Sequence, residues 1–554
     1  MPAPSSFAMT LKGVADCLVT DGLLPLQTRR DMLSAIKRFS ALCSRAPGEI
    51  IADPAVIRDL MTKAPWQLAG YSKASWANMR SLITRAMRFA GVKVDRQRRN
   101  YKLTVPWDVL LAPLDKRNRD ELRRFAGWCS TMGTAPTDVT AQTFDRFLQY
   151  MEEQSTQRGP RERVHVARRV WNRVIAIDGS QYPAIPAPPL AAKRALRWCD
   201  FPASLQTEVA AYSIRATQTD VFDESHKAIK PVTLAGYLTR LRVMLTAAVG
   251  SGVPIDRFTS LDTVIDPAMI KSALEFILAG DELDDRFRQN LHGMVVAALN
   301  VSRFLAPDGA RRSELRKLEK RVRFVAKGMN AKNKERLRVL MNPAARSKLL
   351  RLPLVVAKDM AQVTKSTVRQ VQRMQMAVLL DILLHIPMRI KNAAELDMAS
   401  TISCPVAGLD GKWRISIPAN EVKNLVAVDG ELGLATSELI KIYVTMFRPR
   451  LAKGPSTRLF LGQTGKGKGP SALSKQLARF VKRETGIVIH AHLFRHLAAH
   501  LYLMANPGHY EAVRQLLGHK NIETTIRFYS GLETGQAFAA YDELMEQLQA
   551  GGGS

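Results

Sequence analysis

The chain has 554 residues, of which 46% are hydrophobic and 24% charged, a balance typical of globular proteins. At roughly 150 residues per domain, this length predicts three or four domains. The apolar content is high enough to exclude a wholly disordered chain. The longest apolar stretch, from Ala377 to Ile386, is much shorter than the roughly 20 residues of a membrane span, so we expect no membrane partner. The first residues carry no secretory pattern, which favours a cytoplasmic protein.

The charge balance points to a polyanionic partner. Lys and Arg number 81 against 50 Asp and Glu, which gives a net charge of +31. Phosphate neutralisation drives non-specific nucleic-acid binding, so DNA or RNA is the favoured partner, ahead of a ribosome or an anionic membrane. The five cysteines are scattered, which is typical of a reducing compartment and predicts neither disulfides nor a zinc knuckle.

The first 350 residues have the spacing of successive amphipathic helices. A helix–turn–helix pattern recurs near residues 29–60, 118–148 and 234–274, with the second helix opened by Asp-Pro or by Thr. We therefore predict helical modules at 1–105, 106–192 and 193–310, with a basic joint at 95–101 and a proline-rich hinge after Tyr182. Residues 311–351 hold fifteen Lys/Arg against three Glu and are predicted to form a basic connector that follows DNA.

The pattern of hydrophobic and polar residues changes after Leu352. An apolar helix, 371–386, must be buried, and short alternating stretches near 401–405, 412–417 and 425–428 predict three strands, the last ended by Asp429-Gly430. The predicted fold is mainly α and multi-domain: N-terminal helical DNA-binding modules precede a mixed α/β domain at 352–549 with a small three-stranded antiparallel sheet. Residues 550–554 resemble an added linker.

Two patterns resemble a nucleotide-binding loop and a metal site, but the surrounding sequence supports neither. The glycine-rich stretch Gly462–Gly469 lacks both the spacing and the context of a phosphate loop, and we expect a mobile basic loop there. His492, His496 and His500 are spaced four apart, but no acidic or cysteine partner accompanies them. We therefore predict no metal and no cofactor.

One ordered set of polar residues in the C-terminal region contains the candidate catalytic residues. Arg389 ends the apolar helix, where a charge needs an anionic partner. Lys423 lies in the turn between the second and third predicted strands. The series continues with His492 and Arg495, expected on one helix face, then Leu516-Leu-Gly518-His519, where Gly518 would be a left-handed helix cap, and Tyr529, ten residues further on.

In order and spacing this set resembles the tyrosine recombinase (phage integrase) family, over roughly 352–546. The resemblance implies that Arg389 and Arg495 clamp a phosphodiester, that His492 and His519 bind the phosphate and assist proton transfer, and that Lys423 protonates the leaving 5′ oxygen. Tyr529 would be the nucleophile of a 3′-phosphotyrosyl intermediate, with strands exchanged through a Holliday junction. Two permanently charged guanidiniums would then do the work of a metal ion.

Two departures from the family pattern bear on these assignments. The family has an acidic residue three positions after its first arginine, where this chain has Asn392, which leaves Arg389 less firmly supported. The family's histidine-to-tyrosine spacing is one residue shorter, which would place Phe528 where Tyr529 is needed, so Tyr541 and Tyr510 are fallback nucleophiles.

The resemblance also implies partners. The helical module before the catalytic domain and the basic connector would close around duplex DNA, and the apolar stripe Phe538, Tyr541, Leu544, Met545 and Leu548 would dock in trans within a tetramer rather than pack in cis. Accessory recombination factors are possible partners. Candidate DNA-binding residues are Arg311, Arg312, Arg316, Lys317, Lys320, Arg321, Arg323, Lys332, Lys334, Lys466 and Lys468.

Several functions share this residue set. An integrase or transposase-like recombinase of a mobile element in bacteria is favoured over a resolvase, a telomere resolvase or a type IB topoisomerase. A different class, a catalytically silent DNA-binding architectural subunit, would keep the fold without the chemistry. The complete residue set argues against that reading.

Overall fold

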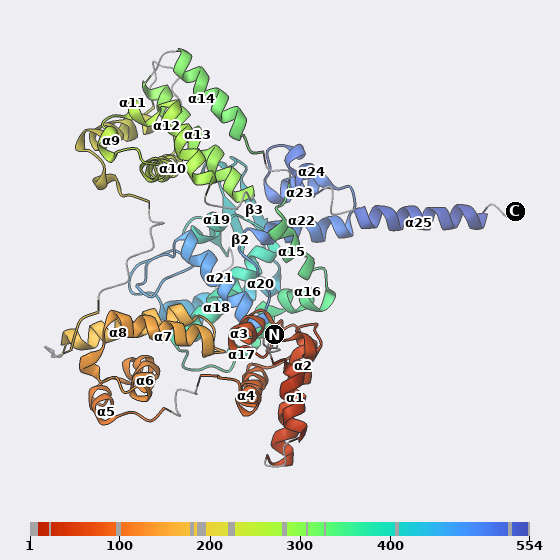
Figure 1. Ribbon diagram of the computed structural model, residues 1–554. Coiled ribbons are helices and arrows are strands. Elements are labelled where there is room, and N and C mark those ends of the chain that lie inside the picture. The colour runs from red at the N-terminus through yellow and green to blue at the C-terminus, as the bar shows by residue number, and fades with distance from the viewer. Residues whose placement is uncertain are drawn as a thin grey trace. The chain divides into compact units, whose positions relative to one another are not determined.

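The computed structural model describes residues 9–20, 24–95, 101–177, 182–185, 195–219, 228–279, 285–305, 309–325, 328–404, 409–529 and 534–551 (Figure 1). Most of the expected joint at 95–101 and of the proline-rich hinge lies outside these residues. The chain divides into two compact units. The first comprises residues 1–188, 336–498 and 516–518, and the second comprises 189–335, 499–515 and 519–554.

Two helical modules begin the first unit, each around its own hydrophobic cluster. One cluster is centred on Phe39 and Ile83, and the other on Phe125 and Trp171. Helix starts follow the predicted chemistry: the Asp53 carboxylate accepts hydrogen bonds from the backbone N–H groups of residues 55 and 56, and the Thr140 hydroxyl caps the third helix of the second module. The helices are α1 (Leu11–Thr20), α2 (Leu26–Leu42), α3 (Pro54–Lys63), α4 (Lys73–Phe89), α5 (Val105–Leu111), α6 (Lys116–Thr131), α7 (Ala141–Gln154) and α8 (Pro160–Ile177).

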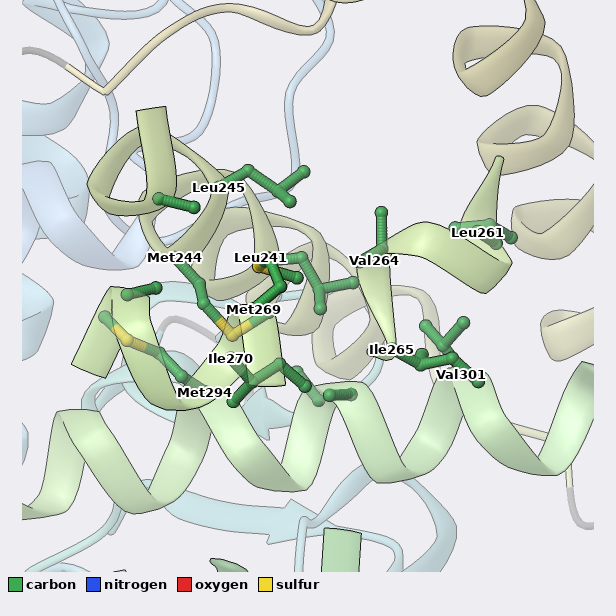
Figure 2. Close-up of a cluster of buried hydrophobic side chains, with 14 of the residues drawn as sticks. Leu241, Met244, Leu245, Leu261, Val264, Ile265, Met269, Ile270, Met294 and Val301 are labelled. Atoms are coloured by element: carbon green, nitrogen blue, oxygen red, sulfur yellow. The ribbon is translucent and has the colours of Figure 1, made fainter. Parts of the chain in front are cut away.

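A third helical module opens the second unit. Figure 2 shows its core, in which Leu241 and Met244 of α10 meet Met269 and Ile270 of α12 and Met294 of α13. By length and composition alone, α10 is the one helix in the described residues that could cross a membrane, yet part of it forms this core. The helices are α9 (Ala203–Thr217), α10 (Pro231–Gly250), α11 (Leu261–Val264), α12 (Pro267–Leu278), α13 (Asp285–Leu305) and α14 (Gly309–Val322).

The basic segment after residue 310 is helical, and its first helix packs into the third module. Leu315 of α14 is buried in that module's core, with Leu318 and Val322 against it, so the predicted boundary at 310 does not separate α14 from the module. Most of the predicted DNA-binding side chains on α14 and α15 (Ala331–Val339) are exposed. Arg311 differs, because it forms an ion pair with Asp262 on α11.

The mixed domain of the first unit is built around α18 (Val368–His385). Its residues from Met374 to Leu383 are all buried, which agrees with the predicted burial of this apolar helix. The helix packs against α17, α20 and α21. The remaining helices of this domain are α16 (Pro343–Leu350), α17 (Leu352–Met360), α19 (Ile390–Ala394), α20 (Leu434–Ile442), which runs on into a π-helical turn at Tyr443–Phe447, and α21 (Pro470–Thr485).

The antiparallel sheet has the predicted number of strands, in the order β1 (Ile402–Ser403), β2 (Arg414–Ile417) and β3 (Val428–Glu431). The third strand was predicted too early: it contains Asp429-Gly430 instead of ending there. A short turn at Ala419–Glu421 and a left-handed Leu425, with a φ of 55°, occupy the residues before it. Pairing therefore begins with Ile417 opposite Val428. The mainly α fold with a small three-stranded sheet is confirmed.

Four helices complete the described part of the chain. They are α22 (Leu493–Ala505), α23 (Tyr510–Leu517), α24 (Ile522–Tyr529) and α25 (Thr534–Gly551). Gly518 follows α23 with a φ of 57°, which confirms the predicted left-handed cap. His492 lies one residue before α22 and not within it, so it does not share a helix face with Arg495 as predicted. It is linked to the first turn because its carbonyl accepts a hydrogen bond from the Arg495 N–H, at 3.2 Å.

Candidate active site

Arg495 is buried, with 4% of its surface exposed, although it carries a permanent charge. Its Nη1 donates to the carbonyl of Pro387 at 2.7 Å, and its Nη2 donates to the carbonyl of Leu517. Pro387 lies two residues before Arg389, and Leu517 lies two residues before His519. One guanidinium therefore joins the segments that carry two other predicted site residues.

The strand turn that carries Lys423 is tied to the same place. The Asn424 side chain donates to the Gly518 carbonyl at 3.0 Å, and Val426 lies against Gly518. Lys423 itself is exposed in the turn between β2 and β3, as predicted. The turn is thus fixed at its base while the ammonium group can reach a ligand outside.

Arg389 is partly buried at the start of α19, and burial lowers the pKa of its guanidinium. Among the described residues no carboxylate forms an ion pair with it. Asn392, which stands where the family has an acid, is 4% exposed, and its buried Nδ2 has no hydrogen-bond partner. A desolvated cation without an acid favours the binding of an external anion.

His492 shares this positive environment. Partial desolvation, followed by the like charges of Arg495, His490 and Arg389, lowers the pKa of His492 to about 4. The residue as a whole is nonetheless exposed to solvent. The imidazole is therefore neutral at pH 7 and able to accept a proton. Its ring lies edge-on to His496, with centroids 5.1 Å apart.

His519 and Tyr529 belong to the second unit. Nδ1 of His519 lies 3.0 Å from the Thr525 hydroxyl, and Arg514 donates to the His519 carbonyl at 2.8 Å, so both ring and backbone are held. Tyr529 ends α24 with 1% of its surface exposed. The fallback tyrosines differ from it, because Tyr541 on α25 is 61% exposed and Tyr510 begins α23.

Lys468 must be removed from the predicted DNA-binding residues. It is 8% exposed, and its ammonium donates to the side-chain oxygens of Gln375 and Gln476. Burial lowers the pKa of Lys468 to about 8. A side chain enclosed in this way cannot contact a DNA phosphate, whereas Lys466 in the same loop is exposed. In the described part of the chain, no group of three His, Cys, Asp or Glu residues could hold a metal ion.

Comparison with known proteins places this region in a family. Residues 353–534 match the phage integrase family, which supports the tyrosine recombinase resemblance of this part of the chain. It is 35% identical over 92 residues to the tyrosine recombinase XerC of Pseudomonas fluorescens, and 28% identical over 146 residues to XerC of Pseudomonas aeruginosa. These matches cover 17% and 25% of this chain, and 30% and 45% of the two relatives, which is less than half of each relative's length.

A solved structure, the XerH site-specific recombinase bound to difH substrate in a pre-cleavage complex, aligns with 56% of this chain and 80% of that chain. The sequence identity is 18% and the TM-score is 0.37.

The electrostatics of His492 can be tested by titration. We expect its ring to remain neutral at pH 6 in the free protein, whereas an ordinary histidine, with a pKa near 6.5, is mostly protonated there. NMR of the ring signals, assigned with His492→Gln, measures this. Arg389→Gln removes one like charge and should raise the pKa of His492, while Arg450→Gln, at an exposed arginine, should not. Titration near 6.5 in the unmodified protein would contradict the described surroundings.

Proposed function

We propose that the protein is a site-specific recombinase that breaks and rejoins duplex DNA in the bacterial cytoplasm. The observation that carries this proposal is the gathering of Arg389, His492 and Arg495 into a positive site in which no described acid neutralises Arg389. Such a site suits a phosphodiester, whose charge grows during nucleophilic attack. Its place in a tyrosine recombinase domain and the net charge of +31 support DNA as the phosphodiester.

In the proposed reaction, the Tyr529 oxygen attacks the scissile phosphorus and the bond to the 5′ oxygen breaks. Lys423 supplies the proton that the 5′ oxygen needs, and a neutral His492 can accept the phenolic proton. Arg389 and Arg495 stabilise the negative charge on the non-bridging oxygens, with His519 as a further hydrogen-bond donor. The 3′-phosphotyrosyl product keeps the bond energy, so attack by another strand's 5′ hydroxyl needs no nucleotide. Exchange would pass through a Holliday junction.

Because Tyr529 is buried, it must become exposed before it can attack DNA. A side chain with 1% of its surface exposed cannot reach a phosphate in duplex DNA. We propose that DNA binding or assembly shifts α24 and exposes the tyrosine. A free monomer would then be inactive.

Charge and exposure identify the proposed DNA-binding surface and the proposed protein-binding surface. On α14 and α15, the exposed Arg316, Lys317, Lys320, Arg321, Lys332 and Lys334 would contact the DNA backbone, together with Arg323 and Lys466. On α25, Phe538, Tyr541, Leu544 and Leu548 are all exposed, which favours docking in trans over packing in cis. We propose that it docks on a second copy within a tetramer on two DNA sites.

The nucleophile is tested by covalent trapping. The protein is mixed with end-labelled duplexes from the ends of its element, nicked so that the released 5′ fragment diffuses away, with chelator present. We expect a protein-linked 3′ end that Tyr529→Phe abolishes without loss of DNA binding, since only the nucleophilic oxygen is removed. Tyr541→Phe, at the exposed fallback, should still form the adduct.

An adduct that survives in Tyr529→Phe would mean that another tyrosine attacks. Binding without an adduct on any substrate would favour the silent architectural subunit, and relaxation of supercoils without site choice would favour a topoisomerase.

The α25 stripe is tested by Leu544→Asp, which places a charge in the proposed interface. We expect mass photometry on DNA to show tetramers of the unmodified protein and smaller species of the variant, with recombination lost. Glu546→Asp, an exposed acidic position on the same helix, serves as the control. Tetramers that persist with Leu544→Asp would contradict docking through this stripe.

A further inference from the structure

The backbone of His519 is held in place by the helix that precedes it. The His519 N–H donates to the Arg514 carbonyl at 3.0 Å, and Nη1 of Arg514 donates to the His519 carbonyl at 2.8 Å. The Arg514 guanidinium is itself held by the Glu511 carboxylate, through bonds of 2.8 and 2.7 Å. These bonds fix the backbone, but they leave the imidazole able to rotate about its side-chain torsions. A separate contact is needed to orient the ring.

Thr525 on α24 makes that contact. Its hydroxyl oxygen lies 3.0 Å from Nδ1 of His519, and the residue is completely buried. Buried threonines in helices commonly donate to the carbonyl four residues earlier, as Thr485 does to Val481 at 2.7 Å. The Thr525 hydroxyl has no such bond within the described residues, where its hydrogen-bond partner is the His519 ring.

The direction of this hydrogen bond determines which nitrogen of a neutral His519 ring carries the hydrogen. A buried hydroxyl that does not donate loses the free energy of a hydrogen bond, so Thr525 donates to Nδ1. Nδ1 is then an acceptor, and the ring hydrogen must be on Nε2. When the ring is protonated, both nitrogens carry hydrogens and the Thr525 hydroxyl accepts instead. Nε2 therefore carries a hydrogen in both states of the ring.

A hydrogen on Nε2 is what a phosphate ligand requires. The non-bridging oxygens of an ionised phosphodiester only accept hydrogen bonds, so they need a donor. A ring with its hydrogen on Nδ1 would present the lone pair of Nε2 to these oxygens, and two acceptors repel each other. The bond from Thr525 disfavours that tautomer. His519 is partly exposed, so an external ligand can reach the residue.

We infer that Thr525 is a positioning residue, which orients the His519 ring and keeps Nε2 a hydrogen-bond donor to the scissile phosphate. The inference rests on the proposed function and deepens it, because Thr525 acts through His519 and does not itself contact DNA. Thr525 lies four residues before Tyr529 on α24, and all three residues belong to the same compact unit. The ring can therefore keep its orientation when a shift of this unit exposes Tyr529.

The test compares two adjacent threonines on α24 in the full-length protein. Thr525→Val keeps the shape of the side chain and removes the hydroxyl, while Thr524→Val removes a partly exposed hydroxyl from the same helix. The rate of adduct formation is measured on the nicked duplex at saturating protein. We expect Thr525→Val to slow it about tenfold, as for the loss of one hydrogen bond, with DNA affinity little changed. Thr524→Val should keep the unmodified rate, and Thr525→Ser, which returns the hydroxyl, should restore most of it.

The tautomer is measured by NMR of the ring nitrogens in the free protein, with the His519 signals assigned through His519→Gln. At a pH where the ring is neutral, we expect the hydrogen on Nε2 and an unprotonated Nδ1. Thr525→Val should give a mixture of both tautomers, whereas Thr524→Val should leave the signals unchanged. A role of Thr525 in packing alone would lower the melting temperature without moving these signals, and that result would overturn the inference.

Other results would also contradict the positioning role. A hydrogen on Nδ1 in the unmodified protein would mean that Thr525 accepts from the ring. An unchanged rate in Thr525→Val would show that the hydroxyl is dispensable, and an equal loss in both valine variants would show a general effect on α24.

The proposed function is judged separately by the Tyr529 adduct. An adduct in the unmodified protein together with any of these contrary results rejects only the role of Thr525. No adduct in the unmodified protein rejects the proposed function and the role at the phosphate, while the NMR signals still decide whether Thr525 sets the tautomer of His519.

Discussion

A buried guanidinium organises the candidate active site. Arg495 must satisfy its charge and its donors inside the protein, and it does so with the carbonyls of Pro387 and Leu517. These bonds join the end of α18 to the end of α23, and Asn424 joins the Lys423 turn to the neighbouring Gly518. Removing Arg495 would leave carbonyls without donors as well as remove a positive charge. The residue is therefore both structural support and proposed ligand contact.

The properties of Arg389 and His492 depend on positive charge that no described acid neutralises. Arg389 is partly desolvated without an ion pair in the described chain. Desolvation, together with the nearby positive charges, lowers the pKa of His492 and keeps its ring neutral. Such an arrangement costs stability in the free protein and lowers the energy of a bound anion. The substitution of Asn392 for an acid strengthens this feature, because a carboxylate at that position would compete with the phosphate for Arg389.

Features that depend only on residues close together in the sequence could be predicted correctly. The buried helix α18, the cap at Asp53, the left-handed Gly518 and the strand turn at Lys423 were all predicted from neighbouring residues. The third strand was misplaced because the length of a turn depends on how its residues pack. The roles of Lys468, enclosed by two glutamines, and Arg311, paired with Asp262, depend on residues distant in sequence.

Arg495 both supports the site and would bind the phosphate, and a charge-neutral substrate tests this double role most directly. Cleavage is measured on duplexes whose scissile phosphate is replaced by a methylphosphonate, with Arg389→Ala and Arg495→Ala. On ordinary DNA each variant should lose about 10²–10³-fold in rate. The neutral linkage should largely restore Arg389→Ala, whose only role is to offset charge, while Arg495→Ala should remain defective because its scaffold is lost. Equal restoration of both variants would contradict the structural role of Arg495, and restoration of neither would contradict the charge-neutralising role of Arg389.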